Sequence, residues 1–242
     1  MFHEGGRAGA LVVHGFTGSP ATMRPLADAF VDAGFTVSLP RLPGHGTTIE
    51  DMMSTGWADW SAEVERAYVE LAERCERVVV AGLSMGATLT CWVAARHPET
   101  AGIVIVNAAV RPYDTDTTAF IQAMVDAGDE IAPGIGADIA DPDSTELAYD
   151  GTPLRALLAL AAAIDELQED LPTITCPALV VNSAVDHVVE PPDVVAEHVA
   201  GLLAGPVERL VLERSYHVAT LDYDKDLLAE RAVEFARKVT SG

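Results

Sequence analysis

The sequence predicts an α/β fold, with a mostly parallel sheet covered by helices on both faces. Short apolar stretches alternate with longer segments of helical periodicity along most of the chain. The apolar stretches are continuous rather than alternating, which is typical of strands buried on both faces. One long segment without a strand signal, from about residue 111 to residue 171, interrupts the pattern and predicts an insertion.

Each element is placed by its own local signals. Ser19-Pro20 reads as a helix N-cap followed by a first helical residue, Gly34 ends that helix, and Pro98 limits a later one. The strands are expected at 10–13, 35–39, 78–81, 102–106, 178–182 and 207–212, and the helices at 20–33, 57–75, 87–96, 193–203 and 225–239.

The insertion predicts a helical cap. Residues 1–110 and 172–242 would form the core and residues 111–171 the cap, all within one folding unit. Helices are expected at 117–127 and 153–167, and no strand is expected between them. The segment carries 14 acidic residues against Arg111 and Arg155, so it disfavours anionic substrates.

Composition excludes several classes of function. The formal net charge is -22, from 15 basic and 37 acidic residues, which repels nucleic acid and anionic membranes. No apolar run is long enough for a membrane helix, and the first residues lack a signal-peptide pattern, so we expect a cytoplasmic protein without stable membrane insertion. Cys75, Cys91 and Cys176 match no zinc or redox spacing and are expected to be buried thiols.

The pentad Gly82-Leu83-Ser84-Met85-Gly86 is the most informative motif. It lies between a β-branched stretch and a helical stretch, which is the strand–turn–helix setting of a nucleophile elbow. A side chain two residues before or after the serine would collide with neighbouring backbone, so both positions favour glycine. Ser84 is therefore the candidate nucleophile, although a turn that merely contains a serine has the same pattern.

A serine nucleophile needs a base and a group that orients the base. His217 follows the strand at 207–212 across a short loop and is the candidate base; the alternative is an exposed loop histidine. Asp186 follows the strand at 178–182 and is the candidate orienting acid; the alternative is a turn aspartate. Its rivals are Glu190, Asp222 and Asp224.

The developing oxyanion needs backbone donors. The N–H of Met85, directly after the serine, is one candidate, and the N–H of Phe16 in the glycine-containing loop 14–18 is the second. His14 in the same loop is expected to be buried and to hold the loop in place.

Apolar stripes on the two insertion helices are candidates for substrate binding. They line an acyl pocket or they only pack the cap onto the core, and the pattern does not choose between these roles. The candidate substrate-binding residues are Phe120, Met124, Leu154 and Leu158.

With these motifs in place, the chain resembles the α/β-hydrolase superfamily, in particular small bacterial carboxylesterases and monoacylglycerol lipases with a helical cap. The resemblance extends over nearly the whole chain and rests on 13–18, 43–46, the pentad 82–86, the Asp186 turn and 215–222. It implies a triad of Ser84, Asp186 and His217, with Phe16 and Met85 as the oxyanion hole.

The resemblance also implies the reaction. A small-molecule ester would be cleaved through an acyl-enzyme, without a metal or organic cofactor. The alternatives are another activity on the same fold, such as a thioesterase, a C–C bond hydrolase or a peptidase, and a binding protein that has kept the pocket without the chemistry.

Overall fold

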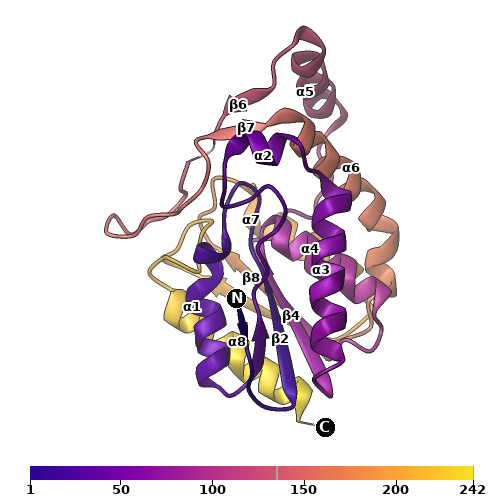
Figure 1. Ribbon diagram of the computed structural model, residues 1–242, viewed down its shortest axis with the longest axis vertical. Helices are drawn as coiled ribbons and strands as arrows, with labels where there is room; N and C mark the ends of the chain where they lie inside the picture. Colours follow the sequence, from indigo (N-terminus) through magenta and orange to yellow (C-terminus); the bar gives the residue numbers. More distant parts are fainter. Residues whose placement is uncertain (135, 242) are drawn as a thin grey trace.

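A seven-stranded sheet runs through the centre of the molecule in the computed structural model, which describes residues 1–134 and 136–241 (Figure 1). The strands are β1 (Phe2–His3), β2 (Ala8–Val13), β3 (Thr36–Ser38), β4 (Arg77–Leu83), β5 (Gly102–Val106), β8 (Ala178–Ser183) and β9 (Val207–Leu212). They lie in the order β1-β3-β2-β4-β5-β8-β9. All neighbours are parallel except β1, which pairs antiparallel with β3.

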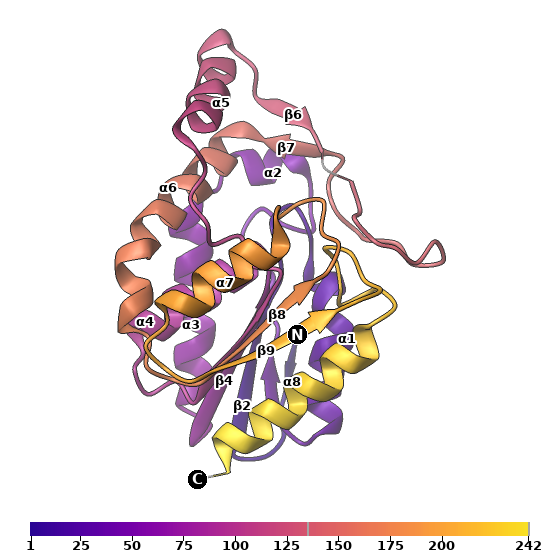
Figure 2. The same ribbon diagram turned by 180° about the vertical axis from the view of Figure 1, so that it is seen from behind.

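Helices cover both faces of the sheet, as predicted. One face packs against α3 (Trp57–Ala72), α4 (Met85–Arg96) and α7 (Pro192–Leu202), and α6 (Leu154–Asp170) packs on α3 and α4. The other packs against α1 (Pro20–Asp32) and α8 (Lys225–Thr240), which lie side by side (Figure 2).

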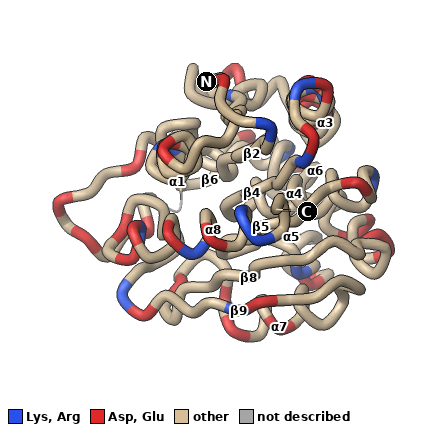
Figure 3. The backbone as a smooth tube through the Cα atoms, turned by 90° about the horizontal axis from the view of Figure 1, so that it is seen from below, with Lys and Arg blue, Asp and Glu red and all other residues tan. Residues whose placement is uncertain are grey.

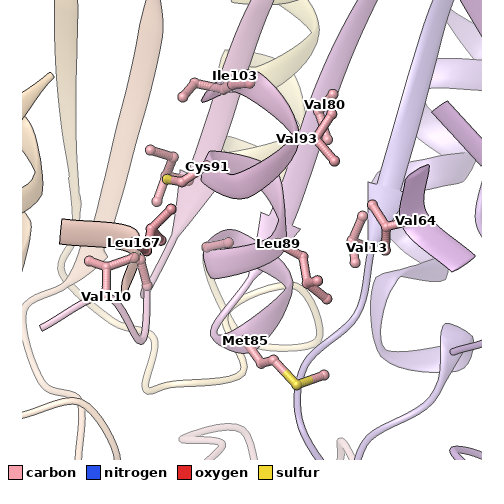
Figure 4. Packing of buried hydrophobic residues seen from close by; sticks show 14 of the residues in the cluster. Val13, Val64, Val80, Met85, Leu89, Cys91, Val93, Ile103, Val110 and Leu167 are labelled. Carbon is pink, nitrogen blue, oxygen red and sulfur yellow. The ribbon is translucent and has the colours of Figure 1, made fainter. Parts of the chain in front are cut away.

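The first of these clusters surrounds the helix that follows the pentad. Val93 of α4 lies beside the strand residue Val80, and both are fully buried (Figure 4). Because α4 is apolar around most of its circumference, it is enclosed by sheet and helices rather than lying at the surface. The start of α4, directly after Ser84, is therefore held by the core.

The insertion departs from the prediction in one respect. It contains α5 (Thr115–Ala127) and α6, as expected, but also two three-residue strands, β6 (Ile131–Pro133) and β7 (Gly151–Pro153), which pair antiparallel. The prediction of no strand was wrong because such short strands show no alternation and each ends in proline, while their pairing partners lie about 20 residues apart. The pair lies between α5 and the body of the molecule (Figure 1).

Two shorter elements also lacked a sequence signal. Strand β1 has only two residues, and helix α2 (Ile49–Met53) has a single turn. The side chain of Thr48 caps α2 by accepting a hydrogen bond from the Asp51 N–H at 3.2 Å. Residues 171–173 form a 3₁₀ turn that continues α6.

The charge and cysteine predictions can be compared with the structure directly. Acidic positions occur along many of the surface loops and helices, with fewer basic ones between them (Figure 3).

The three cysteines are buried and unpaired, and burial raises the pKa of Cys91 to about 12 and that of Cys176 to about 11. Among the described residues, none of the helices combines the length and apolarity that a membrane span requires.

Candidate active site

The nucleophile elbow has the backbone geometry that the pentad predicts. Ser84 lies between the end of β4 and the first residue of α4, with φ 56° and ψ -120°. A positive φ is unfavourable for a residue with a Cβ, so the turn stores strain. The Ser84 N–H donates to the Val106 carbonyl at 3.0 Å, which anchors the turn to the neighbouring strand.

Both glycines of the pentad are required by close backbone approach. A Cβ on Gly82 would overlap the backbone of Gly86 and lie 2.6 Å from Thr90 Oγ1. A Cβ on Gly86 would overlap the Val13 carbonyl and lie 2.7 Å from the His14 carbonyl oxygen. The steric reason for glycine at both positions is thus confirmed, and it extends to the oxyanion loop that follows β2.

Asp186 and His217, predicted from separate loops, are in contact. His217 Nδ1 lies 2.8 Å from Asp186 Oδ2, and both side chains are buried. The other carboxylate oxygen of Asp186 accepts hydrogen bonds from the N–H groups of Val188 and Val189 at 2.9 and 2.8 Å. With Nδ1 of His217 donating to this carboxylate, Nε2 of the neutral imidazole is the ring nitrogen that is left with a lone pair.

The three rival acids serve other contacts. Asp222 is buried and accepts hydrogen bonds from four backbone N–H groups, including those of Tyr216 and Ala140 at 2.8 Å each. Asp224 pairs with Arg214 at 2.9 Å. Glu190 is exposed. Asp186 is therefore the carboxylate that faces His217.

A cavity of about 350 Å³ joins Ser84 to His217. Its walls come from the loop after β2, the elbow, the insertion and the two loops that carry Asp186 and His217. The lining is mainly apolar with a few polar groups: Gly15, Phe16, Thr17, Leu83, Ser84, Ala109, Tyr113, Thr117, Ile121, Gly136, Asp138, Glu146, Ala148, Tyr149, Thr152, Leu157, Leu160, Val188, Val189, His217 and Val218.

The two candidate oxyanion donors come from segments that both lie close to Ser84. Met85 is the first residue of α4, so its N–H has no acceptor within the helix and lies at the positive end of the helix dipole. Phe16 lines the cavity, and its ring packs against Trp60 with centroids 5.8 Å apart. A Cβ on Gly15 would lie 3.4 Å from Ser84 Cβ, which shows how closely this loop approaches the serine.

His14 and His45 hold the loops beside the oxyanion donors. Nε2 of His14 accepts a hydrogen bond from the Leu42 N–H at 3.2 Å, which confirms the predicted pinning role. Nδ1 of His45 donates to the Pro43 carbonyl at 3.0 Å, and its Nε2 has no partner within the part of the chain that the structure describes. Burial is the main cause that lowers the pKa of His14 to about 3 and that of His45 to about 4.

These two histidines make stability sensitive to mild acid. In the unfolded chain they take up protons below their ordinary pKa of 6.5, whereas in the folded protein they stay neutral to about pH 4. The stability that their neutral forms contribute is therefore lost as the pH falls below 6.5. Between pH 7 and pH 5 the free energy of unfolding should decrease by about 3–4 kcal/mol for the two histidines together. Urea unfolding at the two pH values measures this loss.

The matched variant is His45→Phe, which keeps a ring beside Phe16 and Trp60 but cannot titrate. The carboxylates contribute equally to the pH dependence of stability in both proteins, so the difference measures the contribution of His45, including its effect on the pKa of His14. We expect the variant to lose about 2 kcal/mol less than wild type between pH 7 and pH 5. An identical decrease in the free energy of unfolding in the two proteins would contradict the contribution of His45 to this pH dependence.

The predicted acyl-pocket residues do not line this cavity. Phe120 is 67% exposed on the outer side of α5, and Leu154 is buried with Ile121 and Val125 inside the insertion, with Met124 and Leu158 packed around that cluster. Phe120, Met124, Leu154 and Leu158 therefore lie outside the lining of this cavity. Ile121, Leu157 and Leu160 line the cavity instead. Helical periodicity identifies an apolar stripe, but which edge of the stripe faces the serine depends on the rotation of the helix about its axis and on its packing.

Several cavity residues were missed because they lie in the irregular part of the insertion. Glu146 accepts a hydrogen bond from Thr22 Oγ1 at 3.3 Å, and its pKa is raised, chiefly by burial. Tyr149 donates its hydroxyl proton to the Gly44 carbonyl at 2.7 Å, which ties the insertion to the loop at 41–46. Asp138 contacts both the loop that carries Asp186 and the loop that carries His217. Isolated polar residues in a connector carry no periodicity that could have identified them.

The sheet order, the strained serine between strand and helix, and the carboxylate-paired histidine that lines the same cavity as the serine define an α/β-hydrolase. The chain belongs to the family described as "Serine aminopeptidase, S33" (Hydrolase_4), which matches residues 6–224.

Relatives within this class cover almost the whole chain. A thermostable monoacylglycerol lipase from Bacillus sp. (strain H-257) is 46% identical over 98% of this chain and 94% of its own length. A carboxylesterase from Bacillus subtilis is 27% identical over 98% of this chain and 95% of its own. A solved structure from work on LipS and LipT, two metagenome-derived lipolytic enzymes, matches with a TM-score of 0.92 at 44% identity, covering 98% and 96% of the two chains.

Proposed function

We propose that this protein hydrolyses carboxylic esters, with Ser84 as nucleophile, His217 as general base and Asp186 as the group that orients it. The observation that carries the proposal is that the strained elbow serine and His217 line one cavity, with His217 paired to the buried carboxylate of Asp186. The names of the relatives, a monoacylglycerol lipase and a carboxylesterase, support the same chemistry.

The geometry supports a two-step acyl transfer. Ser84 Oγ attacks the ester carbonyl carbon while its proton passes to Nε2 of His217, and Asp186 stabilises the imidazolium through Nδ1. The N–H groups of Phe16 and Met85 donate to the oxyanion. Collapse of the tetrahedral intermediate breaks the C–O bond as His217 returns the proton to the leaving alcohol. Water then repeats the sequence on the acyl-enzyme and releases the acid.

Residues 111–171 act as a cap in this proposal. They contribute about half of the cavity wall, including Ile121, Leu157 and Leu160, whereas Ser84, Asp186 and His217 belong to the core. The apolar wall suits an acyl chain, and the polar side includes Glu146 and Thr152. Together with the acidic balance of the segment, this favours an uncharged ester with a hydroxylated alcohol, such as a monoacylglycerol.

The test compares initial rates on monoacylglycerols and p-nitrophenyl esters of matched acyl length, with Ser84→Ala as the blank. We expect kcat/KM to be about tenfold higher for the glycerol esters, because hydrogen bonds to a substrate hydroxyl stabilise its transition state. Equal rates would mean a general carboxylesterase. Thioester and peptide p-nitroanilide substrates complete the panel, and a Ser84-dependent preference for either would overturn the proposal.

A further inference from the structure

One carboxylate of the insertion contacts both loops that carry the acid and the base. Asp138 Oδ2 accepts hydrogen bonds from the N–H of His217 at 3.1 Å and the N–H of His187 at 3.0 Å. Its Oδ1 lies 2.7 Å from His187 Nδ1. Its backbone carbonyl accepts a further bond from the Val218 N–H at 3.0 Å. His187 directly follows Asp186, so one residue of the insertion joins both parts of the candidate dyad.

The second contact between the insertion and the base loop is also a carboxylate. Asp222, which lies in the base loop, accepts hydrogen bonds from the N–H groups of Ala140 and Asp141 and also from that of Tyr216. Residues 138–141 are thus held against the loop on both sides of His217. This arrangement fixes the backbone of the base from outside the core.

Asp138 is charged in this position. Burial opposes its ionisation, but hydrogen bonds from His187 and His217 outweigh that effect and lower the pKa of Asp138. In turn, the hydrogen bond to Asp138 raises the pKa of His187. Asp138 lines the cavity and its side chain is only 12% exposed, so its charge is poorly screened from the imidazole of His217.

We propose that Asp138 is a positioning residue for His217: it holds the backbone of the base at a fixed distance from the Asp186 loop and adds negative charge that favours the imidazolium. This inference rests on the proposed function, because it assigns His217 the role of base. The insertion then contributes to proton transfer as well as to the shape of the cavity.

The sign of the electrostatic effect follows from the charges around His217. Asp186 contacts the imidazole and Asp138 contacts the backbone N–H of His217, Glu146 lies near enough to interact with the charge of His217, and His187 offsets the charge of Asp138 when it is protonated. Because the base must be neutral to act, kcat/KM falls on the acidic side of the pH profile. The acidic limb is the part of the pH profile in which kcat/KM falls as the pH is lowered. Removing the Asp138 charge should move this acidic limb to lower pH, and removing the His187 charge should move it to higher pH.

The experiment measures kcat and kcat/KM on p-nitrophenyl butyrate from pH 5 to pH 9. Asp138→Asn retains a carbonyl acceptor without the charge, and Asp138→Ala removes both. We expect the acidic limb to move down by about half a pH unit in each, and kcat to fall by about tenfold in Asp138→Asn and by up to a hundredfold in Asp138→Ala. His187→Ala keeps the backbone N–H and should move the limb in the opposite direction.

Asp143→Asn is the matched control, because it removes one exposed negative charge from the same segment. This substitution should leave both kcat and the pH of the acidic limb at their wild-type values. The inference is overturned if both Asp138 variants keep the wild-type limb and kcat, or if they only lower the melting temperature. Ser84→Ala in the same assay distinguishes failure of the proposed function from failure of the role assigned to Asp138. Residual activity of Ser84→Ala refutes the proposed function. If Ser84→Ala is inactive and the Asp138 variants behave like wild type, only the role of Asp138 is refuted.

Discussion

Replacing Ser84 with alanine is expected to lower kcat by about 10⁵–10⁶-fold on any ester that the protein cleaves. The substitution removes Oγ and keeps the Cβ, so the backbone at φ 56° is no more strained than before. The oxyanion donors and the cavity stay in place, so only the acyl-enzyme route is lost. Initial rates on p-nitrophenyl butyrate measure the effect, with the wild-type protein diluted until its rate is comparable with that of the variant.

Covalent labelling provides an independent readout. A fluorophosphonate should modify the wild-type chain once, and mass spectrometry should place the label on Ser84, because the reagent needs an activated hydroxyl. Thr88, one turn into α4 with its hydroxyl bonded to the Ala109 carbonyl at 2.6 Å, supplies the control substitution Thr88→Val. Activity of Ser84→Ala within tenfold of wild type would exclude Ser84 as the nucleophile.

Asp186→Asn is expected to lower kcat by about 10⁴-fold while leaving the fold intact. The asparagine oxygen can still accept from the N–H groups of Val188 and Val189. The amide nitrogen then faces His217 Nδ1 and donates to it, which places the imidazole proton on Nε2. A base protonated on that nitrogen cannot accept the proton of Ser84.

Asp224→Asn is the control for this substitution, because Asp224 is a buried acid near the base loop that bonds Ser215 and Arg214 rather than the imidazole. Both variants lose one buried negative charge, and thermal unfolding of each shows how much stability is lost. Only Asp186→Asn should abolish turnover at a temperature where both proteins are folded. Equal activity losses in the two variants would assign Asp186 a structural role.

Sequence reasoning predicted most of the sheet and the arrangement around Ser84 because these depend on local signals. The strand before the pentad, the helix after it and the two glycines all lie within about 20 residues, and sterics dictates their types. Asp186 and His217 could be selected because each follows a strand end, and parallel strands bring their carboxyl ends to one edge.

The cavity wall could not be predicted in the same way. The choice between Phe120 and Ile121, adjacent on α5, depends on the rotation of that helix, which is set by contacts with α6 about 30 residues later. Asp138 has no local signal at all, since its partners are 49 and 79 residues away in the chain. Long-range pairing of this kind is visible only once the chain is folded.

The sheet order also has a consequence for synthesis of the chain. Strand β5 lies between β4 and β8, and about 70 residues, including the whole insertion, separate β5 from β8 in the sequence. At a translation rate of about 5–20 residues per second, one edge of this apolar strand stays without its neighbour for roughly 4–14 seconds after it leaves the ribosome. An unpaired Gly-Ile-Val-Ile-Val edge is a template for intermolecular pairing. The nascent chain is therefore most prone to aggregation while the insertion is being made, and chaperone binding in that interval would protect the five strands of the sheet that have already been synthesised.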